Sequence, residues 1–311
     1  MTSLVAPFHH QAFFYAGDDE YLAGPAAFVE EGIEAGETVL VAVPPDRRDL
    51  LLDHFGASAN GLLHFASIEE MGGNPARIIP AWSDFVRDHG RSERGARGVG
   101  EPIWSGRSAE ELVECERHEA LLNLALADAT GFKLLCPYDV RSLDRDVIAR
   151  AHRNHPHLDG IRASTAAWTF EPLVPPLLDT ALAPVPASAR TMVFDAGTIR
   201  EVRTLAGEAA SVAGFDANRV DDLEIAVSEA VTNTVLHGGG RGEIAFWYLD
   251  PSFVCEIRDR GRITDPLAGR RRPDLDASGG RGLWLINQLC DLVQLRILPD
   301  GQQVLRLHLS R

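Results

Sequence analysis

Two side chains in the C-terminal third of the chain have the types and the spacing for acid–base and cation chemistry. Glu229 and Asn233 are four residues apart in the segment LEIAVSEAVTNTVLHG. Val227, Ala230 and Val231 recur there at helical spacing, which predicts a helix with Glu229 and Asn233 on one side. The amide oxygen of Asn233 could bind a hard cation, and the carboxylate of Glu229 could accept a proton from a nucleophile.

Two glycine-bearing segments follow this predicted helix. Asp259-Arg260-Gly261 comes directly after a predicted strand, and Gly279-Gly280-Arg281-Gly282-Leu283 begins a predicted helix. Glycines at a helix N-terminus let the backbone approach phosphate oxygens, whose charge the free N–H groups there satisfy. Each of the three pieces is common alone, but their order and spacing together are much more specific.

In this order the three pieces resemble the GHKL ATPase family, and within it the serine kinases that act as anti-sigma factors. The resemblance covers residues 191–311 and implies an α+β Bergerat sandwich that binds ATP and Mg²⁺. It implies that Glu229 is the general base, that Asn233 is the Mg²⁺ ligand, and that residues 262–279 form a mobile lid. Asp259 matches the family's adenine-binding aspartate. The residues assigned to nucleotide binding are Asn233, Asp259, Gly261, Gly280, Arg281 and Gly282.

One departure from the family pattern leaves a second interpretation of the domain's function open. The first glycine box usually reads Asp-x-Gly-x-Gly, and here Ile263 replaces its second glycine. A β-branched side chain at this position adds bulk where the loop normally stays close to the nucleotide. The alternative to a serine kinase is therefore a GHKL domain that binds a partner without turning over ATP.

The rest of the chain predicts two domains. The first domain alternates predicted buried strands with predicted helices, which favours a doubly wound α/β sheet. The strands are predicted over residues 38–44, 62–66, 98–104 and 132–138, and the helices over 46–55, 76–88, 109–129 and 143–152. Such a sheet binds ligands at the carboxyl ends of its strands. Residues 171–190 contain five prolines and predict a semi-rigid linker between domains 1–170 and 191–311. In the second domain, helices at 198–213, 217–237 and 282–290 accompany strands at 242–250, 253–259, 293–298 and 303–309.

The first domain resembles the MEDS sensory domain of methanogen and methylotroph regulators over residues 8–165. The matching pieces are His10 with Tyr15, Gly100-Glu101-Pro102-Ile103-Trp104, Glu119 with Asn123, Cys136-Pro137-Tyr138-Asp139 and His155-Pro156. The resemblance implies a RecA-like layer without a P-loop that binds a small organic molecule. The residues assigned to this sensory pocket are His10, Tyr15, Glu101, Trp104, His118, Cys136, Tyr138 and His155.

Histidines and cysteines in this domain leave two further readings open. One interpretation is a metal site formed by His9, His10, Cys115, His118, Cys136 and His155. No Cys-x-x-Cys pair is present, and the spacing of these residues along the chain does not decide whether they bind a metal. Buried reduced thiols are the simpler reading of the cysteines. His118-Glu119 resembles the start of a phosphoacceptor box, which gives a sensor histidine kinase as a further alternative.

Composition restricts the partners. The net charge of −15 disfavours direct binding to nucleic acid or to an anionic membrane, and no apolar run is long enough to cross a bilayer. The chain has a single lysine, Lys133, and no Gly-Lys-Ser/Thr, so it lacks a P-loop. The two domains together resemble the RsbA-like stress regulators of bacteria. They imply a cytoplasmic protein that binds an alternative sigma factor and phosphorylates a STAS-type anti-anti-sigma protein, with a homodimer left open.

Overall fold

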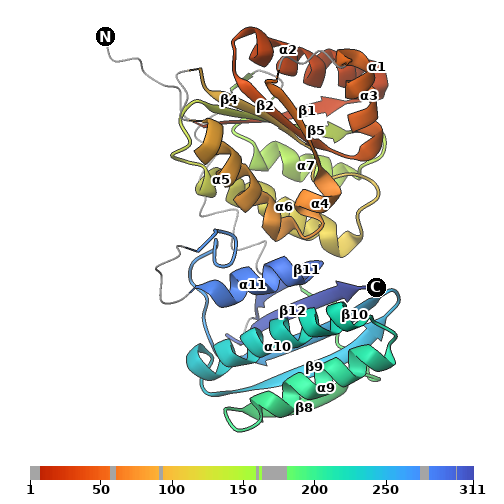
Figure 1. The fold of residues 1–311 in the computed structure, drawn as a ribbon, viewed down its shortest axis with the longest axis vertical. Helices are drawn as coiled ribbons and strands as arrows, with labels where there is room; N and C mark the ends of the chain where they lie inside the picture. Colours follow the sequence, from red (N-terminus) through yellow and green to blue (C-terminus); the bar gives the residue numbers. More distant parts are fainter. Residues whose placement is uncertain are drawn as a thin grey trace. The chain divides into compact units, whose positions relative to one another are not determined.

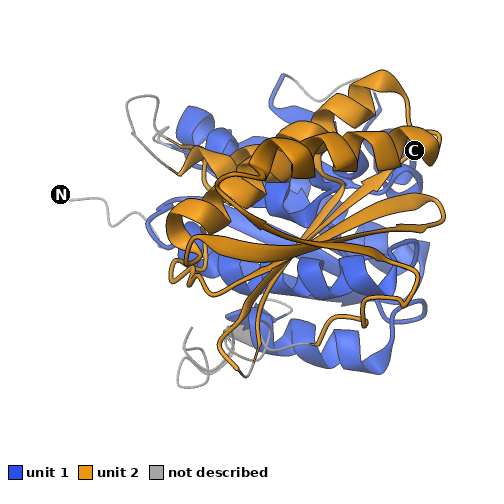
Figure 2. Cartoon of the chain, turned by 90° about the horizontal axis from the view of Figure 1, so that it is seen from below, with its two compact units in different colours: residues 1–174 blue, residues 175–311 orange. Residues whose placement is uncertain are grey.

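The computed structural model describes residues 8–56, 61–90, 94–158, 161–162, 181–273, 280–298 and 300–311. Contacts divide the chain into two compact units, residues 1–174 and 175–311 (Figure 2). Of the predicted linker, residues 171–180 lie outside the described residues, and residues 181–189 contain no helix or strand. The carbonyl oxygen of Ala183 accepts a hydrogen bond of 2.6 Å from Arg306 Nη2. This end of the proline-rich segment is therefore attached to the C-terminal unit.

The N-terminal unit is built on a seven-stranded sheet whose order is β3-β2-β4-β5-β1-β6-β7. All neighbouring strands are parallel except β6 and β7. The strands are β1 (His9–Tyr15), β2 (Thr38–Val43), β3 (Leu63–Ser67), β4 (Ala96–Gly100), β5 (Phe132–Asp139), β6 (His157–Leu158) and β7 (Ile161–Arg162).

Helices cover both faces of this sheet (Figure 1). One face carries α1 (Asp18–Tyr21), the π-helical turn η1 (Leu22–Ala26), α2 (Ala27–Glu34) and α3 (Pro45–Phe55). The other face carries α4 (Ile68–Gly72), the 3₁₀ turn η2 (Pro75–Arg77), α5 (Ile78–His89), α6 (Ala109–Ala125) and α7 (Arg145–Asn154). Parallel strands buried on both faces match the predicted doubly wound layer.

Strand alternation decides which helices each side chain meets. On β4, Arg97 forms a buried ion pair with Glu37 and contacts the carbonyl of Phe28 on α2. The next residue, Gly98, faces the opposite way, because a Cβ built on it would lie 2.6 Å from the ring of Trp82 on α5. Residues an odd number apart on these strands thus belong to different layers of the unit.

Several parts of the N-terminal unit differ from the sequence-based expectation, among them α4, β6 and β7, which the pattern does not predict. The pattern did not predict β1 or the helices between Asp18 and Glu34, because β1 mixes histidines and a glutamine with its aromatic residues. The strand predicted over residues 98–104 ends at Gly100. Pro102 has no N–H to donate to a ladder, so the chain leaves the sheet there.

The C-terminal unit is a five-stranded antiparallel sheet in the order β11-β12-β10-β9-β8. Helices α9 and α10 pack side by side on one face of it (Figure 1). The elements are β8 (Arg190–Asp195), α9 (Ile199–Val212), α10 (Ala217–His237), β9 (Arg241–Leu249), β10 (Ser252–Asp259), α11 (Arg281–Leu289), β11 (Leu292–Ile297) and β12 (Gln303–Ser310). The predicted α+β layer is confirmed, and the sheet is antiparallel throughout its described strands.

The long helix α10 positions the predicted chemistry. It begins at its N-cap Asp216, whose side chain accepts a hydrogen bond from the Arg219 N–H. Leu223, Val227 and Val231 lie on its buried stripe and join the core with residues of the sheet. Burial of this stripe fixes the rotation of the helix about its axis. Among the helices that the structure describes, none is long and apolar enough to span a bilayer.

Candidate functional site

The acid–amide pair of α10 faces the first turn of α11. Glu229 and Asn233 are both half-buried. A Cβ built on Gly282 would lie 2.9 Å from Glu229 Oε2 and 3.0 Å from Asn233 Nδ2. Any side chain at position 282 would therefore compete for the space in front of these two polar groups. The structure brings together three of the residues that the sequence pattern assigned to one site.

The N-terminus of α11 is formed by glycine. Gly280 is the N-cap and has a left-handed backbone, with φ of +82° and ψ of 0°. Such a backbone favours glycine, and the exposed Arg281 follows as the first helical residue. The first N–H groups of a helix lack partners within the helix and carry a partial positive charge. The preceding Gly279 lies outside the described residues.

Asp259 ends β10 with its carboxylate held from two sides. Thr234 Oγ1, on α10, donates a hydrogen bond of 2.6 Å to Asp259 Oδ2. The Gly261 N–H donates one of 2.7 Å to Asp259 Oδ1. Gly261 packs closely here, since a Cβ on it would lie 3.1 Å from Gly238 Cα. The carboxylate is thus fixed in orientation and keeps acceptor capacity for a ligand.

A cavity of about 600 Å³ joins these groups. Its lining includes Asn233, Asp259, Gly261, Gly280 and Gly282, but neither Glu229 nor Arg281. A volume of this size falls in the range of small-molecule and cofactor sites. Five of the six residues assigned to nucleotide binding therefore line one cavity.

The segment predicted as a lid is described only in part. Residues 262–273 contain no helix or strand and contribute several residues to the cavity wall, and residues 274–279 lie outside the described residues. Ile263, the departure from the glycine box, lines the cavity. Its N–H donates a hydrogen bond of 3.0 Å to Gln303 Oε1 on β12.

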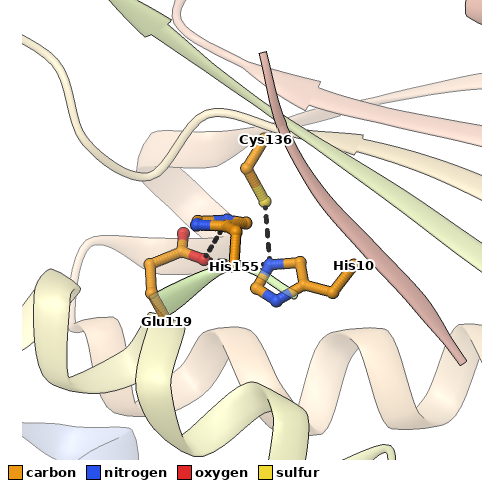
Figure 3. Close-up of side chains that lie close together, drawn as sticks. All are labelled: His10, Glu119, Cys136 and His155. Carbon is orange, nitrogen blue, oxygen red and sulfur yellow. Dashed lines mark hydrogen bonds and ion pairs between the residues drawn. The ribbon is translucent and has the colours of Figure 1, made fainter. Parts of the chain in front are cut away.

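The N-terminal unit holds a second polar cluster, formed by His10, Glu119, Cys136 and His155 (Figure 3). All four side chains are buried, and they come from β1, α6, β5 and the residue that follows α7. His10 Nε2 lies 3.1 Å from Glu119 Oε2 and 3.3 Å from Cys136 Sγ. His155 Nε2 lies 3.3 Å from the same Glu119 oxygen.

Burial controls the protonation of this cluster. Loss of solvent, together with the neighbouring His155, lowers the pKa of His10 to about 4. Loss of solvent and the nearby Glu119 carboxylate raise the pKa of the Cys136 thiol well above its ordinary value. At neutral pH, His10 is therefore neutral and Cys136 is a thiol.

A third group of polar residues lies on the opposite face of the same sheet. The Tyr15 hydroxyl donates a hydrogen bond of 2.7 Å to Glu101 Oε1. Burial raises the pKa of Glu101 to about 8, although Tyr15 and the Arg47 guanidinium act in the opposite direction. Tyr15, Glu101, Trp104 and Arg47 line a cavity of about 60 Å³ near the carboxyl ends of the strands.

The eight residues assigned to a sensory pocket do not share one pocket. His10 and Cys136 belong to the buried cluster, whereas Tyr15, Glu101 and Trp104 line the strand-end cavity. Tyr15 is an odd number of residues from His10 on β1, so the two side chains leave the sheet on opposite faces. Tyr138, which the resemblance also assigns to the sensory pocket, is not among the residues that line the strand-end cavity. Its ring packs on His155, with the ring centroids 5.6 Å apart, on the side of the cluster. His118 is buried on α6 and is outside the four-residue cluster.

Sequence reasoning left several site residues unassigned. The sequence pattern marks Glu119 and Asn123 as a motif but does not place them in a pocket, although their spacing of four residues puts them on one side of a helix. Thr234 and Arg47 gave no such signal, since their roles depend on contacts with residues distant in the chain.

Family models match both units. The model of the MEDS domain, described as the methanogen/methylotroph DcmR sensory domain, matches residues 9–156. The model of the histidine kinase-like ATPase domain matches residues 192–308.

Individual relatives match the C-terminal unit. Serine-protein kinase RsbW of Listeria monocytogenes is 39% identical over 100 residues, and the match covers 28% of this chain and 64% of the Listeria protein. RsbW of Bacillus pumilus is 34% identical over 109 residues, and the match covers 30% of this chain and 67% of that protein. The crystal structure of the RsbU and RsbW domains of a Mycobacterium tuberculosis protein is 20% identical, with a TM-score of 0.30, and covers 40% of this chain and 33% of that one.

The two family matches lie in separate compact units, and the histidine kinase-like match falls in the unit that contains Glu229, Asn233 and the glycine-bearing turns. The chain therefore belongs to the proteins in which a MEDS sensory domain precedes a histidine kinase-like ATPase domain of the RsbW type.

Proposed function

We propose that the chain is a switch protein that controls an alternative sigma factor through a serine kinase domain. The C-terminal unit binds the sigma factor and phosphorylates a serine of a STAS-type anti-anti-sigma protein. The observation that carries this proposal is the convergence of Glu229 and Asn233 on Gly282 at the start of α11. Similarity to the RsbW serine-protein kinases supports the reaction class. This chain spans 64% of the Listeria protein, so the substrate and partners are part of the proposal.

The residues around the C-terminal cavity fit ATP and Mg²⁺. The Asn233 amide oxygen is a suitable ligand for a hard cation. The first N–H groups of α11, made accessible by Gly282, suit phosphate oxygens. The Asp259 carboxylate, oriented by Thr234 and Gly261, is an acceptor for the amino group of adenine. When bound, ATP with Mg²⁺ supplies the transferable phosphoryl group and a counter-charge for it.

Glu229 acts as the general base in this proposal. Its carboxylate is half-buried, lies one helical turn from Asn233 and faces the start of α11. It accepts the proton of the partner's serine hydroxyl as the phosphoryl group is transferred, within hydrogen-bond reach. The chain forms no covalent intermediate.

The nucleotide site is tested by calorimetry with the full chain. Asn233→Ala should abolish the Mg²⁺-dependent part of the affinity for ATP, because the amide oxygen is the proposed ligand. Asn218→Ala, at the exposed start of the same helix, is the matched control and should bind as the wild type does. Unchanged Mg²⁺-dependent binding by Asn233→Ala would reject the ligand role.

A second candidate, a partner-binding module without catalysis, is favoured by one observation. Ile263 extends into the lining of the cavity where the family usually has glycine. If this side chain obstructs the nucleotide, the wild type should fail to bind ATP, and Ile263→Gly should restore binding. If both proteins bind ATP with similar affinity, this candidate is rejected and the kinase proposal stands.

The histidine kinase alternative is disfavoured by the position of His118. The residue is 1% exposed on α6, whereas a phosphoacceptor must reach the nucleotide. After incubation with labelled ATP, we expect no acid-labile phosphate on the chain. The N-terminal unit is proposed to sense a small organic molecule through a RecA-like layer, in keeping with its match to a sensory domain.

A further inference from the structure

We propose that His10, Glu119, Cys136 and His155 bind a divalent transition metal ion of the zinc type inside the N-terminal unit. This site is separate from the nucleotide site and does not depend on the proposed kinase activity.

The four donor atoms already have nearly the spacing of a tetrahedral site. Two imidazole nitrogens, a sulfur and a carboxylate oxygen all lie within 4.8 Å of one another. Tetrahedral zinc with bonds of about 2.0–2.3 Å places its ligand atoms roughly 3.3–3.8 Å apart. Three of the separations in the cluster are 3.1, 3.3 and 3.3 Å. Small side-chain movements would therefore suffice to surround an ion.

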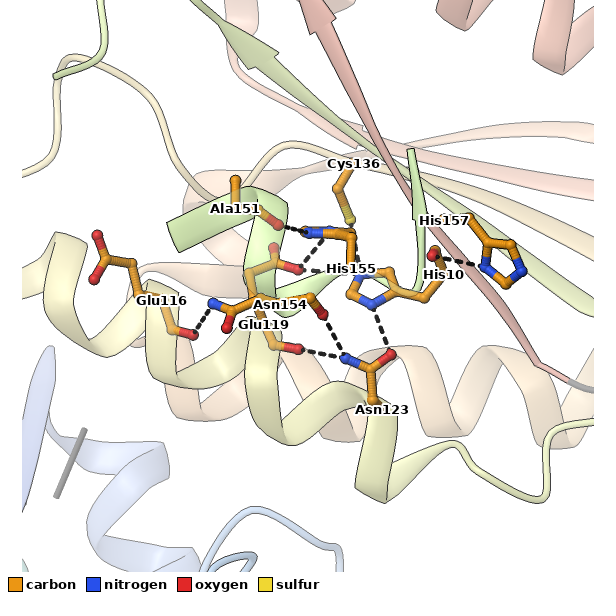
Figure 4. A network of polar contacts seen from close by, with 9 residues as sticks. All are labelled: His10, Glu116, Glu119, Asn123, Cys136, Ala151, Asn154, His155 and His157. Atoms are coloured by element: carbon orange, nitrogen blue, oxygen red, sulfur yellow. Dashed lines mark hydrogen bonds and ion pairs between the residues drawn. The ribbon is translucent and has the colours of Figure 1, made fainter. Parts of the chain in front are cut away.

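The surrounding hydrogen bonds aim both imidazoles at the centre of the cluster (Figure 4). Asn123 Nδ2 donates to the carbonyl oxygens of Glu119 and Asn154, which fixes the amide orientation. Asn123 Oδ1 must then accept from His10 Nδ1, 3.0 Å away. In the same way, His155 Nδ1 donates to the Ala151 carbonyl at 2.8 Å. Both Nδ1 atoms thus carry the proton, and both Nε2 atoms present lone pairs to the cluster.

This arrangement leaves a carboxylate opposite two lone pairs. Neither oxygen of Glu119 has an aligned hydrogen bond from a described residue, and neither does His155 Nε2. All four side chains are at most 1% exposed. A buried carboxylate without a counter-charge is costly, and a divalent cation accepting both lone pairs would remove that cost. A mixed nitrogen, sulfur and oxygen donor set suits zinc better than magnesium or calcium, which prefer oxygen.

The other way to balance the charge is an extra proton on one Nε2 atom, which would make an imidazolium–carboxylate pair. Metal analysis distinguishes a bound zinc ion from such an imidazolium–carboxylate pair. The full chain is produced in defined medium in which Zn²⁺ is the added transition metal, purified, and analysed by mass spectrometry for metals. We expect about one zinc per chain. A wild-type chain that contains no zinc would overturn the proposal in favour of the ion pair.

Matched variants identify the ligands. Cys136→Ser and His155→Gln should each lower the zinc content at least tenfold. Cys115→Ser and His157→Asn should retain it, because the buried Cys115 thiol donates to the Pro102 carbonyl and the His157 ring contacts the His10 backbone instead. Equal zinc in the Cys136 and Cys115 variants would contradict the assignment. Asn123→Ala, which removes the group orienting His10, should weaken binding about 10–100-fold.

Cobalt gives a readout that needs no variant. The wild-type chain produced with Co²⁺ should show the visible absorption of a tetrahedral cobalt ion and a near-ultraviolet thiolate-to-cobalt charge-transfer band. The thiolate band should disappear in Cys136→Ser. A wild-type spectrum without a thiolate band would overturn the proposed role of Cys136 even if that variant failed to fold.

Discussion

The two units contain polar clusters of opposite kinds. In the N-terminal unit, His10, Glu119, Cys136 and His155 are buried and point at one another. In the C-terminal unit, Glu229 and Asn233 are half-buried and lie directly against Gly282, and Asn233 and Gly282 line an open cavity. The four donor atoms of the first cluster lie within 4.8 Å of one another, whereas the second cluster adjoins a cavity with the volume of a cofactor site.

This difference determines how readily each cluster can exchange a bound ion or ligand with the solvent. The proton or metal ion that balances the charge of a buried cluster contributes to the stability of the fold. It can leave only when the unit opens locally. A cluster beside an open cavity has little effect on folding but controls the affinity and reaction of a ligand that comes and goes. Substitutions should therefore change stability in the N-terminal unit and ligand behaviour in the C-terminal unit.

The largest expected effect is on phosphoryl transfer. Glu229→Gln should slow phosphorylation of the anti-anti-sigma protein about 10²–10⁴-fold, because the glutamine amide cannot accept the proton of the serine hydroxyl. Its affinity for ATP should stay that of the wild type. The measurement is transfer from labelled ATP, with Asp221→Asn, at an exposed position of α10, as the control. Full activity of Glu229→Gln would remove the general base from the proposal.

A pH-dependent effect on stability is expected in the N-terminal unit. Burial raises the pKa of Glu101 from 4.5 to about 8. Between pH 4.5 and about 8, the Glu101 carboxyl is therefore protonated in the folded state and ionised in the unfolded state. The free energy of unfolding accordingly falls as pH rises from 4.5 to 8, by at most about 1.4 kcal/mol per unit, and is constant above.

Glu101→Gln should abolish this fall. Urea denaturation of the full chain is best compared between pH 6.5 and 8, since His10, with its pKa lowered to about 4, contributes an opposite trend below 6.5. Glu110→Gln, at the exposed start of α6, should keep the wild-type slope. The prediction fails if wild type and Glu101→Gln differ by the same amount at every pH.

An intermediate effect is expected from one added methyl group. Gly282→Ala places a Cβ 2.9 Å from Glu229 Oε2 and 3.0 Å from Asn233 Nδ2. Displacement of these groups should weaken ATP binding roughly tenfold, in line with about 1–3 kcal/mol for overpacking. Gly197→Ala, at a turn before α9, is the control, and calorimetry is the measurement. Wild-type affinity in Gly282→Ala would show that the close approach does not matter.

The smallest effect concerns the orientation of Asp259. Thr234→Val removes the hydroxyl that donates to Asp259 Oδ2 but keeps the side-chain shape. We expect a loss of about 1 kcal/mol in ATP binding. Thr234→Ser, which keeps the donor, should bind ATP like the wild type. If both variants bind equally, the hydroxyl does not orient the carboxylate for the nucleotide.

Local sequence patterns predicted the C-terminal site because its parts are local. Glu229 and Asn233 are one helical turn apart, and the apolar stripe of α10 sets the side on which they project. Gly280 and Gly282 mark the start of the next helix in the same way. The pattern could not give the hydroxyl of Thr234 a role, since its partner is 25 residues away on another element.

The sequence by itself determined the two layer types and, for the elements with a clear apolar pattern, the side that is buried, since these follow from the periodicity of side chains along one element. Only the tertiary structure decided which of the candidate sensory residues meet. The parallel pairing of β1 with β5 brings His10 near Cys136, and α6 and the end of α7 add Glu119 and His155. Strand alternation sends Tyr15 to the other face, towards Glu101. Such convergence depends on the register between segments more than a hundred residues apart, and spacing along the chain carries no information about that register.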